Sequence, residues 1–208
     1  TLAVWLAHEG AEVVGIDVSS GILDVARRRA ELSGVGDACT FVHTPIEAFA
    51  AEAFASAGGG FDAIIGNNVV HHFDRDLAMA RIATLLRPGA IAVFCEPMLF
   101  VPEPVRALRY SSMVARRFPP HTHTEDERSL NDGDLEVMAK HFRHVAWKPF
   151  QLSARLQNFV ELSDAWWNRL EAFDRRFLAA VPVSRRTCRM AVITLGLPRD
   201  HTVPGTQH

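Results

Sequence analysis

Polar side chains that can accept a proton or bind a hydroxyl group follow the strand-like runs of the first half of the chain. They are Asp17, His43, Thr44, Asn67, Asn68, His71, His72 and Glu96. Imidazole can remove a proton near neutral pH, and carboxylates and amides bind hydroxyl groups. Because the carboxyl ends of parallel strands meet at one edge of a sheet, where ligands bind, we expect the site there.

Asp17 ends the run EVVGID directly before the start of an expected helix. A carboxylate in this place can accept both hydroxyl protons of a ribose, a contact that selects a nucleoside. The alternative is an ordinary acid at a helix entry, where it interacts with the helix dipole. The residues alone leave both readings open.

The elements that must position these residues alternate between helix and strand. Strands are predicted over residues 12–17, 39–43, 61–66 and 90–95, and helices over 1–9, 20–32, 48–57 and 74–86. Ser19 or Ser20 and Asp74 are candidate N-caps, and Pro88 with Gly89 indicates a turn. Continuous apolar strands separated by helices are typical of a parallel sheet covered by helices on both faces.

The second half has a different pattern. Prolines interrupt it after Pro97, a helix is predicted up to Arg117, and the polar residues 121–134 have a lid-like composition. Further elements are expected over residues 134–141 (helix), 145–152 (strand), 163–180 (helix) and 189–197 (strand). In the long helix the apolar stripe Trp166, Leu170, Phe173 and Phe177 is predicted to face the core, with Trp167 off it. Trp167 is expected to pack at the edge of the helix, and the alternatives are that it lines a substrate pocket, a dimer contact or a lipid surface.

Composition excludes several classes of protein. The 208 residues carry 22 Lys+Arg and 24 Asp+Glu, a formal net charge of −2, which disfavours a dedicated nucleic-acid binder. The apolar run 90–95 is far shorter than the roughly 20 residues of a membrane span. The three scattered cysteines form no CxxC pair, so we expect a reduced, cytoplasmic setting.

Three segments together resemble class I S-adenosylmethionine-dependent methyltransferases. They are GIDVS (15–19), FDAIIGNNVVHHF (61–73) and LLRPGAIAVFCEP (85–97), which occur in the order and spacing of that family's second, fourth and fifth strands. The resemblance covers roughly residues 1–100. It implies a Rossmann-like α/β fold, with a mainly parallel, seven-stranded sheet and an antiparallel strand near the C-terminus.

The resemblance also implies roles for individual residues. The cofactor would be S-adenosyl-L-methionine, with Asp17 on its ribose, Val18 beside the adenine and Ile46 on the adenine face. Pro45 stands where many family members have an acid for the adenine amino group, and Glu47 could replace it. Five further residues line the same expected edge: Asn67 and Asn68 by the methionine part, His72 or His71 as a base near the methyl group, and Glu96 as a substrate-binding acid, a base or a solvated acid.

The family's glycine-rich loop, GxGxG, is absent from this sequence. By comparison with the family pattern, its last glycine would immediately precede Thr1. We therefore expect that the sequence is N-terminally truncated and that a strand and this loop precede it.

The combined prediction is an enzyme with residues 1–97 as the cofactor-binding core. Residues 98–208 would complete the same domain with helical segments that cap the substrate. Methyl transfer to a small molecule, at oxygen, nitrogen or carbon, is expected, without nucleic acid, and a homodimer is left open. His121 and His123 are read as part of a polar loop, so no metal site is expected. The alternatives are a non-catalytic methyltransferase-like scaffold and an NAD-dependent Rossmann oxidoreductase.

Overall fold

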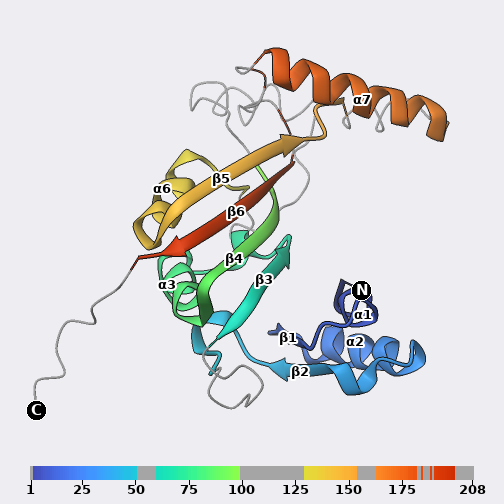
Figure 1. The fold of residues 1–208 in the computed structure, drawn as a ribbon, viewed down its shortest axis with the longest axis vertical. Helices are drawn as coiled ribbons and strands as arrows, with labels where there is room; N and C mark the ends of the chain where they lie inside the picture. The colour runs from blue at the N-terminus through green and yellow to red at the C-terminus, as the bar shows by residue number, and fades with distance from the viewer. Residues whose placement is uncertain are drawn as a thin grey trace, which may run out of the picture. The chain divides into compact units, whose positions relative to one another are not determined.

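The computed structural model describes residues 2–50, 60–98, 129–153, 163–181 and 190–199, together with Ser184 and Cys188. The chain divides into two compact units, residues 1–58 and 59–208 (Figure 1). The predicted helix up to Arg117 and most of the 121–134 loop lie outside the described residues. The division into a cofactor-binding core (residues 1–97) and a part that completes and caps it (residues 98–208) stays a prediction.

The first unit is a two-stranded parallel sheet with helices. Its elements are α1 (Leu2–His8), β1 (Val13–Asp17), α2 (Ser20–Leu32), η1 (Gly36–Ala38), β2 (Cys39–His43) and η2 (Ile46–Ala48). β1 and β2 run parallel, with Val13 opposite Cys39 and Asp17 opposite His43. Asp17 and His43 therefore share one end of this sheet.

Helix α2 begins where the sequence predicts. Ser19 has extended backbone angles, and its hydroxyl accepts the Ile22 N–H at 3.4 Å, as an N-cap does. Leu23, Ala26 and Ala30 form its buried face. The 3.6-residue spacing of these small and apolar side chains anchors the helix, and with it the turn that follows Asp17.

The second unit contains a four-stranded sheet in the order β3-β4-β6-β5 (Figure 1). Its elements are β3 (Phe61–Asn67), η5 (Val70–His72), α3 (Arg75–Leu85), β4 (Leu86–Pro97), α6 (Asp132–His141), β5 (Phe142–Phe150), α7 (Asp164–Ala180) and β6 (Met190–Pro198). β3 and β4 are parallel, and β6 is antiparallel to both of its neighbours, β4 and β5. The predicted mainly parallel sheet with one late antiparallel strand is confirmed.

The core of this unit lies between the sheet and helices α3 and α6, which pack against each other. It consists of fully or almost fully buried side chains of the sheet and of these two helices: Ala78, Met79, Ile82, Ala92, Phe94, Met138, Phe142, Ile193 and Leu195. Asp74 caps α3 by accepting the Leu77 N–H at 3.2 Å. This core holds the carboxyl ends of β3 and β4 in a defined place.

Two local predictions are wrong. Pro88 and Gly89 do not form a separate turn before the strand predicted over residues 90–95, because both lie inside β4. Phe61 pairs with Leu86 whereas Ala63 pairs with Ile91, so β4 bulges at this point, with Gly89 at φ +84°. The second error concerns the helix predicted from residue 48. The helix does not start at residue 48, because the 3₁₀ turn η2 ends there and Phe49 and Ala50 have no regular structure; residues 51–57 lie outside the described part.

Helix α7 turns a different face inward from the one predicted. Trp166 and Phe173 are 55% and 57% exposed, whereas Asp174 and Leu178 are buried. The Asp174 carboxylate accepts two hydrogen bonds from Ser153, through its N–H at 2.9 Å and its hydroxyl at 3.0 Å. These bonds allow an acid to enter the buried face, and the aromatic stripe stays outside.

Gly66 gives a first testable prediction. A Cβ at this position would lie 2.6 Å from the Phe94 ring and 2.7 Å from the Val69 side chain. Phe94 is buried and cannot move without disturbing the sheet. We expect Gly66→Ala to lower the free energy of unfolding by about 1–3 kcal/mol, the usual cost of overpacking. Urea denaturation measures this, and Gly133→Ala, in the first turn of the exposed start of α6, is a comparison. Equal midpoints for Gly66→Ala and wild type would contradict the close packing.

Cys188 gives a prediction about alkaline pH. Burial, and next the negative charge of Asp174, raise the pKa of its thiol from 9.0 to about 11. Between these values the unfolded chain has lost the proton that the folded protein still holds, so stability falls as pH rises. We expect a loss of about 3 kcal/mol across this window, at ~1.4 kcal/mol per pKa unit. Subtracting the curve of Cys188→Ala isolates this thiol from other groups, and parallel curves would contradict the prediction.

Candidate active site

Asp17 lies at the carboxyl end of β1, in the turn that leads into α2. Its Oδ1 accepts the Ser19 N–H at 2.7 Å, and its Oδ2 has no hydrogen-bond partner among the described residues. The carboxylate is partly exposed, so it can still accept hydroxyl protons from a ligand. The turn therefore uses one oxygen of Asp17 and leaves the other available, which is compatible with both readings of this acid.

The neighbours of Asp17 in the first unit include an exposed apolar side chain and a histidine. Val18 is 69% exposed. Its carbonyl accepts a hydrogen bond from Nε2 of His43 at 2.9 Å, which ties the turn to the end of β2. Ile46 is buried and Glu47 is partly exposed, so Glu47 is the more accessible of the two predicted adenine-side residues. Their roles toward a nucleoside stay predictions.

In the second unit, Asn67 ends β3 and Asn68 makes the sharp turn after it. Asn68 has φ +53°, a left-handed conformation that asparagine tolerates better than most residues. Its N–H donates to the Cys95 carbonyl at 2.9 Å. Both asparagine side chains are exposed at this end of the sheet. They are thus accessible to a ligand, although neither is placed against one.

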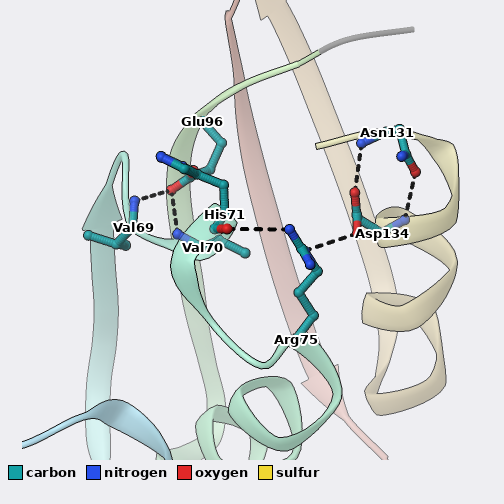
Figure 2. Close-up of polar contacts among 7 residues, drawn as sticks. All are labelled: Val69, Val70, His71, Arg75, Glu96, Asn131 and Asp134. Carbon is teal, nitrogen blue, oxygen red and sulfur yellow. Dashed lines mark hydrogen bonds and ion pairs between the residues drawn. The ribbon is translucent and has the colours of Figure 1, made fainter. Parts of the chain in front are cut away.

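Glu96 follows Cys95 in β4 and is fully buried, with 0% exposure. Its Oε1 accepts the N–H groups of Val69 and Val70 at 2.8 and 3.0 Å, and Nδ1 of His71 lies 2.9 Å from its Oε2 (Figure 2). The expectation of a solvated acid is therefore wrong. The carboxylate holds the whole loop between β3 and α3 by three hydrogen bonds.

The two histidines of this loop differ in their surroundings. The side chain of His71 is 12% exposed and is hydrogen-bonded to Glu96, whereas His72 is exposed. Their ring centroids lie 4.1 Å apart. Within the described residues a carboxylate contacts His71 and not His72, so the structure distinguishes two residues that the sequence could not separate.

A second set of polar contacts connects the same loop to helix α6 (Figure 2). Nη2 of Arg75 donates to the His71 carbonyl at 3.3 Å, and its Nε lies 3.0 Å from Oδ1 of the buried Asp134. Asp134 in turn accepts the Asn131 N–H at 2.8 Å, and the Asn131 side chain caps α6 in a capping box. The loop that bears the histidines is thus braced from two sides.

The chain segments on either side of residues 99–128 meet next to this loop. Met98 and Leu130 form a parallel bridge, and the Leu130 N–H donates to the Pro97 carbonyl at 2.9 Å. Both residues are almost completely buried. The described residues on either side of 99–128 are therefore joined within two residues of Glu96.

Sequence reasoning missed Arg75, Asn131 and Asp134. The Asn-x-x-Asp spacing of a capping box was a usable signal for Asn131 and Asp134. Nothing in the sequence pairs Arg75 with an acid 59 positions away. Within the described ranges, no three or more His, Cys, Asp or Glu side chains are grouped so that they could hold a metal ion, and residues 121–126 lie outside these ranges. In the same ranges no helix has the length and hydropathy of a membrane span.

The sequence of this chain is similar to those of known methyltransferases. Residues 1–94 match a family described as a methyltransferase domain. Over 120 residues the chain is 37% identical to a ubiquinone biosynthesis O-methyltransferase of Ruegeria pomeroyi, which covers 57% of this chain and 45% of that protein. The chain spans about half the length of this and other curated relatives that it matches.

Solved structures show the same fold at low sequence identity. The geranyl diphosphate C-methyltransferase of Streptomyces coelicolor A3(2) has a TM-score of 0.56 and 15% identity, over 92% of this chain and 67% of that one. Residues 1–94 are thus similar to a methyltransferase domain, and the described elements have the fold of this solved methyltransferase. A structure named [4+2]-cyclase SpnF has a TM-score of 0.57 and 15% identity, over 95% and 71% of the two chains.

The methyltransferase-domain match removes one alternative function and leaves another. An NAD-dependent oxidoreductase does not fit the family match of residues 1–94. The name of the cyclase indicates that the fold also occurs in a protein named for a different reaction. The reaction of this chain must therefore be argued from its own residues.

Proposed function

We propose that this protein is an enzyme that transfers a methyl group from S-adenosyl-L-methionine to a small-molecule acceptor. The methyltransferase-domain match of residues 1–94 carries the proposal. Curated relatives with 31–37% identity are named O-methyltransferases, and solved neighbours contain S-adenosylhomocysteine. The bound cofactor would supply an electrophilic methyl group on a sulfonium.

The residues at the end of β1 fit the nucleoside part of this cofactor. Oδ2 of Asp17 is a charged acceptor without a partner in the described part of the chain, and ribose offers two hydroxyl donors. The exposed Val18 offers an apolar surface suited to the face of adenine. We propose these two residues as nucleoside contacts, with Ile46 and Glu47 as further candidates in the same unit.

The residues after β3 are proposed to act on the methionine part and on the acceptor. Asn67 and Asn68 present exposed amides, which can bind the amino and carboxylate groups of an amino acid. His71 and His72 offer imidazoles for proton removal. O-methylation agrees with the names of the curated relatives, and the acceptor itself is proposed only as a small molecule.

Three broader features belong to the same proposal. The net charge of −2 supports a small acceptor over nucleic acid. A cytoplasmic location is supported by three cysteines without a CxxC pair, and a homodimer is compatible with the exposed aromatic residues of α7. Residues 1–97 would hold the cofactor, and residues 98–208 would complete and cap the site.

Isothermal titration calorimetry with S-adenosylhomocysteine tests the proposal. We expect saturable binding of one molecule per chain and no binding of NAD under the same conditions. Protein that binds neither compound would favour the non-catalytic scaffold. Methyl transfer from labelled S-adenosylmethionine to a panel of hydroxyl, amine and carbon acceptors then identifies the acceptor atom.

A further inference from the structure

The contacts of the loop that bears the histidines distinguish the roles of His71 and Glu96. We propose that His71 is the general base for a hydroxyl acceptor and that Glu96 is a positioning residue that holds His71 in the tautomer with a free Nε2. This inference rests on the proposed methyl transfer and specifies its acceptor as a hydroxyl group. Its geometric basis is the buried contact between the two side chains.

The proposal takes Glu96 as an ionised carboxylate, which is an acceptor only. Two backbone N–H groups donate to its Oε1 at 2.8 and 3.0 Å, and Nδ1 of His71 lies 2.9 Å from its Oε2. In this state both oxygens of Glu96 face a group that can donate. With 0% exposure, Glu96 cannot itself reach a ligand in this conformation. Its function is therefore to hold the loop and the imidazole.

The state of Glu96 determines where His71 carries its proton. A carboxylate cannot donate, so Nδ1 of His71 must bear the hydrogen in the 2.9 Å contact. A neutral imidazole has one N–H, which leaves a lone pair on Nε2. Nε2 has no hydrogen-bond partner within the described ranges, and the side chain keeps 12% exposure. This arrangement gives the loop one proton-accepting nitrogen with a defined orientation.

The other titratable and charged groups around His71 support the assignment. Within the described residues these are His72 from the same loop, Arg75 from α3, and Asp134 from α6. Arg75 lies against the His71 carbonyl and is paired with Asp134, so its charge is balanced. His72 is exposed and is hydrogen-bonded to no carboxylate within the described residues.

In the proposed step, the hydroxyl oxygen of the acceptor forms a bond to the methyl carbon. The carbon–sulfur bond breaks and its electron pair stays on sulfur, which loses its positive charge. The hydroxyl proton passes to Nε2 of His71, and the resulting imidazolium is paired with the Glu96 carboxylate. The proton then leaves to water, which restores the neutral histidine. An amine substrate that reacts as the free base needs no proton-accepting residue while the bond to the methyl carbon forms.

The first test is the tautomer of His71, read by ring ¹⁵N–¹H correlation NMR with His71→Asn to assign the signal. We expect the Nδ1–H form in wild type at pH 8. In Glu96→Gln, the amide oxygen can accept from Val69 and Val70 while its NH₂ group donates to Nδ1. The proton then moves to Nε2, so the spectrum should switch to the other tautomer. An Nε2–H tautomer in wild type would overturn the proposal, whether or not an acceptor is known.

The second test measures turnover with catechol as a hydroxyl probe and aniline as an amine probe. His71→Asn keeps a donor to Glu96 and loses the base, so kcat with catechol should fall about 10²–10⁴-fold. Glu96→Gln should lower it similarly, and His144→Asn, at an exposed histidine of β5, should leave it near wild type. The acid limb of the kcat–pH profile should disappear in His71→Asn.

Binding of S-adenosylhomocysteine distinguishes a failure of the proposed methyltransferase function from a failure of the proposed role of His71. Wild-type protein that fails to bind it contradicts the methyltransferase function itself. Normal binding together with undiminished kcat in His71→Asn contradicts only the base. A loss of kcat with unchanged cofactor affinity and an unchanged unfolding midpoint supports the base, because a merely structural histidine would change the midpoint.

Discussion

Glu96→Ala is expected to lower the free energy of unfolding by roughly 3–5 kcal/mol. The substitution removes the acceptor of the Val69 and Val70 N–H groups and of His71, all at 2.8–3.0 Å. Because the carboxylate site is fully buried, bulk water cannot directly replace these bonds. Urea denaturation followed by circular dichroism measures the effect. The site loop should also become exposed to amide hydrogen exchange at Val69 and Val70.

Glu136→Ala is the matched control for this prediction. Glu136 is an exposed glutamate of α6, and its removal should change stability by no more than about 0.5 kcal/mol. Glu96→Gln should fall between the two, since its amide oxygen can still accept the backbone N–H groups. Equal stabilities for Glu96→Ala and Glu136→Ala would show that the Glu96 contacts do not hold the loop.

Asp17→Ala should weaken the binding of S-adenosylhomocysteine by about 1–3 kcal/mol, or roughly 5–150-fold in Kd. The reason is the loss of charged acceptors for the ribose hydroxyl groups, which bind a carboxylate more strongly than a neutral group. Calorimetry measures the affinity directly. Catalysis by a variant saturated with cofactor should change far less, because Asp17 is not proposed to touch the reacting groups.

Asp17→Asn separates the ligand role from the structural role. Its amide oxygen can still accept the Ser19 N–H, so the turn into α2 should be kept. We expect an unfolding midpoint close to wild type together with a reduced affinity. Asp37→Ala, at an exposed acid in the same unit, should alter neither quantity. Affinity that falls only when the midpoint falls would favour the helix-entry reading of Asp17.

Much of the fold could be predicted from local patterns. The strand Cys39–His43 has the predicted bounds, and Ser19 and Asp74 cap the helices as expected. These features depend on neighbours in sequence: a β-branched run favours an extended strand, and a side-chain oxygen at the N-cap accepts a free N–H of the first turn. The positions of Asp17, Asn67, His71 and Glu96 at strand ends follow from the same local order.

Long-range contacts decided what local patterns could not. In α7 the periodicity allowed two neighbouring faces, one with Phe173 and one with Asp174, about 100° apart around the helix. Hydrophobicity alone selected the aromatic face. The buried face instead includes Asp174, because Ser153, which lies 21 residues away, donates two hydrogen bonds to one oxygen of its carboxylate.

At the candidate site, Glu96 shows the same difference between what local sequence determines and what long-range contacts decide. The sequence by itself determined that an acid ends the strand and that two histidines follow the neighbouring strand, because each fact is written in adjacent residues. Only the tertiary structure decided that this acid is buried and that it orients His71 rather than His72. The parallel pairing of β3 with β4 brings residues 25–27 positions apart within hydrogen-bond distance. Such pairing depends on sheet register and core packing, which no short stretch of sequence contains.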